Sequence, residues 1–125
     1  MVLLDTYTLI WYMFDSSRLS GTVKDRIGNE EKVYYSIVSL WEISIKQSIG
    51  KLDLDCSMIE LAEKCEEAGL MVLNIKPEHI EGIKNLPDHH NDPFDRLLIS
   101  QATIERLGFI SKDTIISSYD IDVIW

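Results

Sequence analysis

Short apolar runs alternate along this chain with longer segments in which apolar residues recur every three or four positions. Runs that are wholly apolar, or rich in β-branched and aromatic residues, predict strands buried within a sheet. Four such runs occupy residues 2–4, 33–38, 70–75 and 109–111, and the closing residues 120–125 offer a fifth. The pattern therefore predicts a sheet of four to five strands.

The segments between these runs predict helices. Ser20, Ser57 and the pair Asp92-Pro93 are typical helix starts, and glycine is a typical helix end. The predicted helices cover residues 8–14, 20–28, 39–50, 57–69, 77–86 and 92–108. Strands that alternate with helices predict an α/β domain with a mainly parallel sheet. Because no repeat, linker or low-complexity segment interrupts the pattern, a single domain is expected over residues 1–125.

The composition indicates a folded protein with a core of its own. Of the 125 residues, 46% are hydrophobic, while 12 basic and 21 acidic residues leave a formal net charge of −9, which excludes a disordered acidic tail. Cys56 and Cys65 are too few for a disulfide framework. No apolar run approaches the ~18 to 20 residues that span a membrane. We expect a reduced, cytoplasmic setting, and the acidity argues against binding duplex DNA through phosphate neutralisation.

Four acidic residues occupy positions that a parallel sheet can bring together. Asp5 follows the first predicted strand and Asp113 follows the fourth, Glu42 lies one turn into the helix after the second strand, and Asp95 lies in the first turn of the last helix. Ligands of such sheets bind beyond the carboxyl ends of the strands. Clustered carboxylates repel one another unless a cation neutralises them, and oxygen ligands suit Mg²⁺ or Mn²⁺. Such an ion can activate water toward a phosphoryl group.

Each acid also has an ordinary structural interpretation. Ser39-x-x-Glu42 matches a capping box, and Glu42 with Lys46 matches an ion pair one helical turn apart. Turn formation after a strand also accounts for Asp5 and Asp113, and attraction to a helix N-terminus accounts for Asp92 and Asp95. The conjunction of the four positions, rather than any one of them, favours the metal-site interpretation.

Segments in the expected order along nearly the whole chain resemble a known family. They are Leu4-Asp5-Thr6, Ser39-Leu40-Trp41-Glu42-Ile43 with Lys46, Gly50-Lys51-Leu52, the run Asp92 to Ile99 with Gln101-Ala102, and the closing Tyr119 to Trp125. Together they resemble a PIN domain of the VapC toxin type. The resemblance implies a three-layer α/β/α fold around a mainly parallel central sheet. It also implies a metal-dependent endoribonuclease that hydrolyses RNA phosphodiester bonds with Mg²⁺ or Mn²⁺, as the toxin of a type II toxin–antitoxin pair.

The same resemblance carries site residues and partners. Asp5, Glu42, Asp95 and Asp113 match the acidic metal-binding and catalytic residues of the family. A homodimer is implied, together with a cognate antitoxin that wraps a groove of the toxin. One position departs from the pattern, because the family usually has threonine two residues before the last acid and this chain has Ser111. The hydroxyl is retained, so the site is expected to survive the change.

Other polar and aromatic residues leave alternatives open. Asp92 either caps its helix, the expected role, or contacts metal through water, and Lys46 and Arg96 either meet a phosphate or balance nearby acids. His89-His90 has no cysteine partner and predicts a solvated loop rather than a zinc site. The aromatic residues on apolar helices predict core or subunit interface rather than base stacking, and they are Trp11, Tyr12, Phe14 and Trp41.

Two other classes of function compete with the nuclease. A phosphoacceptor receiver domain is also a small acidic parallel-sheet protein. Resemblance to that class would require a pair of acids after the first strand, whereas here Asp5 is followed by Thr6. Its acceptor aspartate would follow the third strand, where this chain has Asn74. The second class is a non-catalytic PIN-like binding module whose acids are relics, and the presence of all four acids argues against it.

Overall fold

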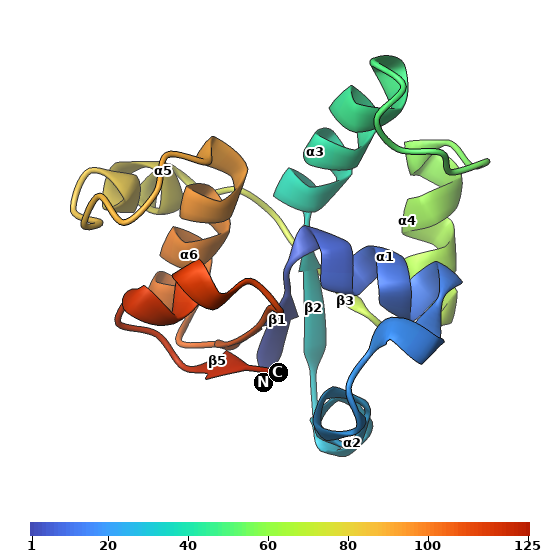
Figure 1. Ribbon diagram of the computed structural model, residues 1–125, viewed down its shortest axis with the longest axis horizontal. Coiled ribbons are helices and arrows are strands. Elements are labelled where there is room, and N and C mark those ends of the chain that lie inside the picture. Colours follow the sequence, from blue (N-terminus) through green and yellow to red (C-terminus); the bar gives the residue numbers. More distant parts are fainter.

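A five-stranded parallel sheet forms the centre of the computed structural model, which describes all residues 1–125 (Figure 1). The strand order is β3-β2-β1-β4-β5, and every neighbouring pair is parallel. The strands are β1 (Val2–Leu4), β2 (Val33–Ser36), β3 (Met71–Leu73), β4 (Gly108–Ile110) and β5 (Val123–Ile124). The predicted α/β class with a parallel sheet is confirmed.

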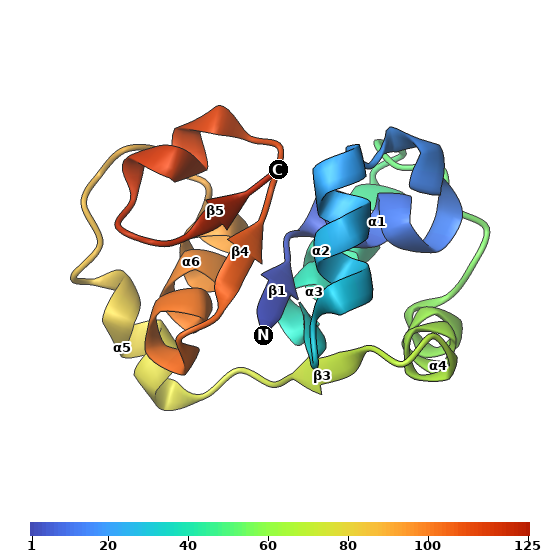
Figure 2. The ribbon, with the colours of Figure 1, turned by 90° about the horizontal axis from the view of Figure 1, so that it is seen from below.

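Helices cover both faces of this sheet. They are α1 (Thr6–Phe14), α2 (Gly21–Asn29), α3 (Ile37–Ser48), α4 (Met58–Glu67), α5 (Pro77–Ile83) and α6 (Pro93–Glu105), with short 3₁₀ turns η1 (Ser16–Arg18) and η2 (Thr114–Ser118). Figures 1 and 2 show α5 and α6 on one side of the sheet and α1, α2 and α4 on the other. No helix combines the length and apolar character needed to cross a membrane.

The central strand β1 separates two apolar cores. Val2 and Leu4 pack into the core beneath α1, α2 and α4, whereas Leu3 packs into the core beneath α6. None of the three side chains is exposed, as expected of a wholly apolar strand buried on both faces. Truncation of a leucine at such a position typically costs about 2–5 kcal/mol. The two cores therefore hold the carboxyl end of β1, and the residue that follows it, in a fixed place.

The second predicted strand proves shorter than expected, and this changes how its helix begins. Residues 37 and 38 belong to α3, and Ser36 caps the helix by accepting a hydrogen bond from the backbone N–H of Val38 at 3.0 Å. The predicted capping box of Ser39 and Glu42 is therefore wrong, because Ser39 lies inside the helix. Glu42 is released from a capping role and lies on the second turn.

Several other predicted boundaries move for identifiable reasons. α1 begins at Thr6 rather than at residue 8, because Asp5 caps it. Gly28 lies inside α2 instead of ending it, and Arg106 at φ 56° ends α6, which places Gly108 in β4. The expectation of a buried third strand is wrong as well, since β3 lies at the edge of the sheet and exposes two of its three residues.

Candidate active site

The structure brings all four predicted acids into the wall of one cavity. It lies at the carboxyl end of the sheet, where β1 and β2 continue into α1 and α3 (Figure 1). The cavity has a volume of about 180 Å³ and is lined by Asp5, Thr6, Tyr7, Glu42, Lys46, Asp92, Asp95 and Asp113. We call it the acidic cavity. Five of its eight residues are carboxylic acids, supplied by segments far apart in the sequence.

Asp5 is fixed where β1 ends. One of its carboxylate oxygens accepts a hydrogen bond from the backbone N–H of Thr8 at 2.8 Å, which caps α1. Burial raises the pKa of Asp5, although hydrogen bonds from Ser111 and Thr8 oppose the shift. Ser111, the residue that departs from the family pattern, thus keeps a hydroxyl in contact with the first acid. Its hydroxyl also accepts from the N–H of Asp113 at 3.2 Å.

Glu42 is held by two neighbours inside the acidic cavity. Its side chain is 5% exposed. Thr6 Oγ1 donates a hydrogen bond to Oε1 at 2.6 Å, and Lys46 Nζ donates to Oε2 at 2.7 Å. The predicted ion pair one helical turn apart is confirmed. Burial lowers the pKa of Lys46, but hydrogen bonds to Glu42 and Tyr7 outweigh it, so the net shift is upward and the ammonium stays charged.

Asp95 is a second acid whose ionisation the cavity opposes. It lies in the first turn of α6, where its backbone N–H donates to Asp92 at 2.9 Å, which confirms the capping role of Asp92. Burial, together with the charges of Asp92, Asp5 and Glu42, raises the pKa of Asp95 to about 7, while a hydrogen bond from His90 opposes the shift. The folded chain therefore holds more negative charge at this point than it stabilises by itself.

Asp113 completes the set from the exposed rim. It follows β4 and caps η2 by accepting from the N–H of Ile115 at 3.1 Å. In their present positions, no three histidine, cysteine, aspartate or glutamate side chains lie close enough together to hold a metal ion. The chemistry of the donors nevertheless fits a hard divalent cation, because all are carboxylate oxygens and burial raises the pKa of two of them.

A comparison with known protein families identifies the family of this chain. The sequence model of the PIN domain matches residues 2–122 of the chain. This chain belongs to the PIN domain family. No curated protein gives a significant match. The family and the fold that the sequence motifs implied are thus confirmed.

Solved structures similar to this PIN domain include one described as a toxin–antitoxin complex. VapBC2 from Rickettsia felis, bound to a promoter DNA fragment, matches with a TM-score of 0.71 and 11% identity over 99% of this chain and 98% of that chain. FitAcB from Neisseria gonorrhoeae matches with a TM-score of 0.66 and 17% identity over 100% and 97%. A toxin–antitoxin complex from Klebsiella pneumoniae gives 0.66 and 16% over 100% and 97%. At these identities the likeness establishes the fold.

Arg96 has a structural role in the PIN domain. Its side chain is only 12% exposed and does not line the acidic cavity. The guanidinium donates to the Tyr119 hydroxyl at 3.1 Å and to backbone carbonyls of Ile83, Leu86, Pro87 and His90. Arg96 therefore ties the loop between α5 and α6 to the end of the chain, and the phosphate-contact alternative considered for it loses its support.

His90 is a site neighbour that sequence reasoning missed. The loop was expected to be solvated, yet the ring is half-buried, with Nδ1 2.7 Å from the Tyr119 hydroxyl and Nε2 3.3 Å from Asp95 Oδ2. The signal available in the sequence was its position five residues before Asp95. His90 orients one of the acids without lining the acidic cavity itself.

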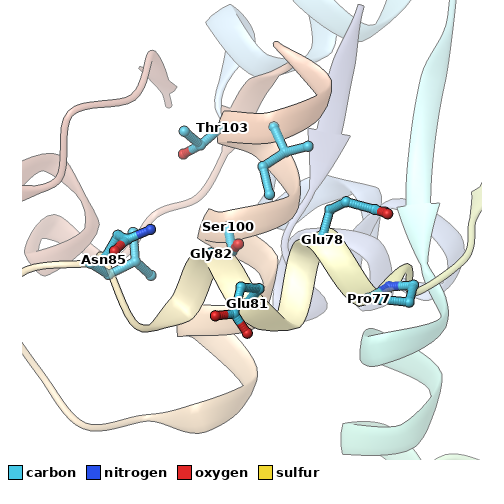
Figure 3. A pocket seen from close by; sticks show the side chains of 9 residues that line it. Pro77, Glu78, Glu81, Gly82, Asn85, Ser100 and Thr103 are labelled. Atoms are coloured by element: carbon cyan, nitrogen blue, oxygen red, sulfur yellow. The ribbon is translucent and has the colours of Figure 1, made fainter.

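A larger hollow lies between α5 and α6 and contains none of the four acids. Its volume is about 720 Å³. Figure 3 shows Ser100 of α6 next to Gly82 of α5. A Cβ on Gly82 would lie 2.5 Å from Ser100 Oγ, so only glycine allows the two helices to approach this closely. We treat this hollow as a feature of helix packing.

Proposed function

We propose that this PIN domain protein is a metal-dependent endoribonuclease that hydrolyses RNA phosphodiester bonds, and that it is the toxin of a type II toxin–antitoxin pair. The observation that carries the proposal is the acidic cavity, where the ends of β1 and β4, the second turn of α3 and the first turn of α6 contribute carboxylates. Membership of the PIN domain family and the likeness to toxin–antitoxin structures support it.

Asp5, Glu42, Asp95 and Asp113 would hold Mg²⁺ or Mn²⁺. When bound, such an ion supplies Lewis acidity toward a phosphoryl oxygen and makes water more acidic. The chain itself positions the donors. Thr6 fixes one oxygen of Glu42 at 2.6 Å, and the N–H of Thr8 fixes Asp5 at 2.8 Å.

Lys46 is the cation best placed to meet the substrate. It lines the acidic cavity and keeps its charge through contact with Glu42 and Tyr7. Its ammonium can therefore contact a phosphate oxygen at the same place where the carboxylates gather. The two roles considered for Lys46, contact with a phosphate and charge balance with a nearby acid, are therefore compatible.

Cleavage of RNA tests the proposal directly. The wild-type protein should cleave a mixed RNA pool in Mg²⁺ or Mn²⁺, lose the activity in excess chelator, and arrest growth when it is expressed alone. Asp5→Asn should abolish both effects. Asp120→Asn is the matched control, because Asp120 is exposed and outside the cavity. Cleavage that persists in chelator, or full activity of Asp5→Asn, would reject the metal mechanism.

An antitoxin partner and a homodimer complete the proposal. A groove of about 710 Å³ between α4 and β3 has eight apolar residues among its ten, and β3 is an edge strand that pairs with β2 on one side only. A partner protein that covers this groove would remove exposed Ile59 and Met71 from water. Coexpression with the product of the neighbouring gene should relieve growth arrest and yield a stable complex. Light scattering on the purified chain measures whether it forms a dimer by itself.

A further inference from the structure

A second cavity adjoins the acidic cavity and differs from it in chemistry. It has a volume of about 480 Å³ and is lined by Asp5, Tyr7, Trp11, Lys112, Asp113 and Thr114. Asp5, Tyr7 and Asp113 belong to both cavities, so the two are contiguous. We propose that this second cavity, the aromatic cavity, receives the base of a nucleotide next to the phosphodiester that is cleaved. The inference rests on the proposed function and adds a binding subsite to it.

Two aromatic rings on the same face of α1 form the wall of the aromatic cavity. Tyr7 and Trp11 are four residues apart, and their ring centroids lie 6.0 Å apart at an interplanar angle of 38°. Tyr7 is 44% exposed and Trp11 is half-buried. The expectation that Trp11 lies in the core or at a subunit interface is thus incomplete, because its indole also lines a cavity open to solvent.

The indole of Trp11 is held in place before any ligand arrives. Trp125, at the end of the chain, packs edge-on against it with centroids 5.8 Å apart at 66°. A ring held by a helix and by a second indole loses little conformational freedom when a base stacks on it. Every nucleobase has a flat π face, so such a ring binds bases with little regard to sequence.

Basic side chains gather around these two rings although the chain is strongly acidic. Lys46 Nζ lies 4.7 Å from the centroid of Tyr7, and Arg18 and Lys112 lie 5.6 and 5.8 Å from that of Trp11. Three of only 12 basic residues thus surround one aromatic pair. Lys112 is exposed, so it can leave the indole face to a base and contact the adjoining phosphate.

The combination favours single-stranded nucleic acid over other occupants. Aromatic faces bind bases, ammonium and guanidinium groups bind phosphates, and both are found in proteins that bind single strands. The shared residues Asp5 and Asp113 place such a nucleotide directly beside the carboxylates proposed for cleavage. A side chain of a partner protein is the competing occupant, and the experiment separates the two.

Binding without cleavage provides the test. A fluorescent single-stranded oligoribonucleotide is titrated with metal-free protein, and an abasic chain of the same length serves as a second probe. Tyr7→Leu should weaken binding of the RNA by about tenfold. Tyr7→Phe, which keeps the ring and loses only the hydroxyl that contacts Lys46, should retain most of the RNA affinity. The two Tyr7 variants should bind the abasic chain equally, whereas Lys112→Gln should weaken binding of both probes.

Trp41→Leu is the matched aromatic control. Trp41 is 55% exposed on α3 and lines neither cavity, so its replacement should leave RNA binding unchanged. Unchanged RNA binding by Tyr7→Leu, or equal wild-type affinity for RNA and abasic chain, would overturn the inference. The inference would also be overturned if Tyr7→Leu lost binding to the partner protein but kept its binding to RNA. If the protein bound RNA more tightly than the abasic chain but did not cleave RNA in Mg²⁺ or Mn²⁺, the proposed function would be rejected. The base-binding role of the aromatic cavity would still be supported.

Discussion

Replacement of Asp95 by asparagine should stabilise the metal-free protein at neutral and higher pH. The pKa of Asp95 in the folded chain is about 7, against an ordinary value of 3.8, chiefly because the carboxyl is buried. A group that binds its proton more tightly in the folded state contributes most to stability at low pH. That contribution is lost as the pH rises from about 4 to about 7. Asparagine has a similar shape, but its amide stays neutral at every pH in this range. The variant therefore keeps its stability as the pH rises.

The size of the effect follows from the shift and from the exposure of the side chain. A shift of three pKa units corresponds to at most about 4 kcal/mol. The Asp95 side chain is 23% exposed, so water screens part of this, and we expect about 1–2 kcal/mol. For a domain of this size that is roughly 4–8 °C in Tm. The difference between Asp95→Asn and wild type should be near zero at pH 4 and largest at pH 8.

Thermal unfolding followed by circular dichroism, in chelator and across this pH range, measures the difference. Asp120→Asn is the control for removal of an exposed charge. Addition of Mg²⁺ or Mn²⁺ should stabilise the wild type more than Asp95→Asn, which narrows the gap. A lower stability of Asp95→Asn than of wild type at pH 8, or a difference that does not change with pH, would show that burial of the Asp95 charge does not destabilise the fold.

Three further substitutions test individual contacts. Thr6→Val removes the 2.6 Å hydrogen bond to buried Glu42 and should cost about 1–3 kcal/mol in urea unfolding, with Thr6→Ser retaining most of the stability. Arg96→Met leaves the carbonyls of the loop between α5 and α6 without donors, and limited proteolysis should cut that loop faster than in wild type, whereas equal rates would contradict its tying role. Gly82→Ala forces a methyl group toward Ser100 Oγ and should lower the free energy of unfolding by about 1–3 kcal/mol; a Gly82→Ala, Ser100→Gly double variant should recover part of it.

The order of strands and helices, and several helix starts, could be predicted because they depend on neighbours within one helical turn. Ser57, a predicted helix start, forms a capping box with Glu60, with hydrogen bonds in both directions at 3.1 and 3.3 Å. Gly50 and Gly69 follow α3 and α4 and have positive φ, which agrees with the prediction that glycines end these helices. Errors arose where local preference was ambiguous. Residues 37 and 38 are β-branched and suit a strand, but the cap at Ser36 starts the helix earlier.

The candidate site divides in the same way. The sequence by itself indicated that Asp5 and Asp113 would share one end of the sheet, because a parallel sheet directs the carboxyl ends of its strands to one edge. It also indicated that Glu42 and Asp95, near the starts of two helices, could join them there. The sequence could not predict which side chain would contact each acid. Thr6 and Glu42 are 36 residues apart when they form their hydrogen bond, and such contacts carry no local pattern.

Tertiary structure also decided where the basic and aromatic side chains lie. Arg96 turns toward backbone carbonyls, while Lys46 lines the acidic cavity. Trp125, at the far end of the chain, packs against the indole of Trp11. Periodicity and capping report on residues within four positions of one another. The depth of a cavity, and hence the raised pKa of Asp95, depends on segments that meet only after the whole chain has folded.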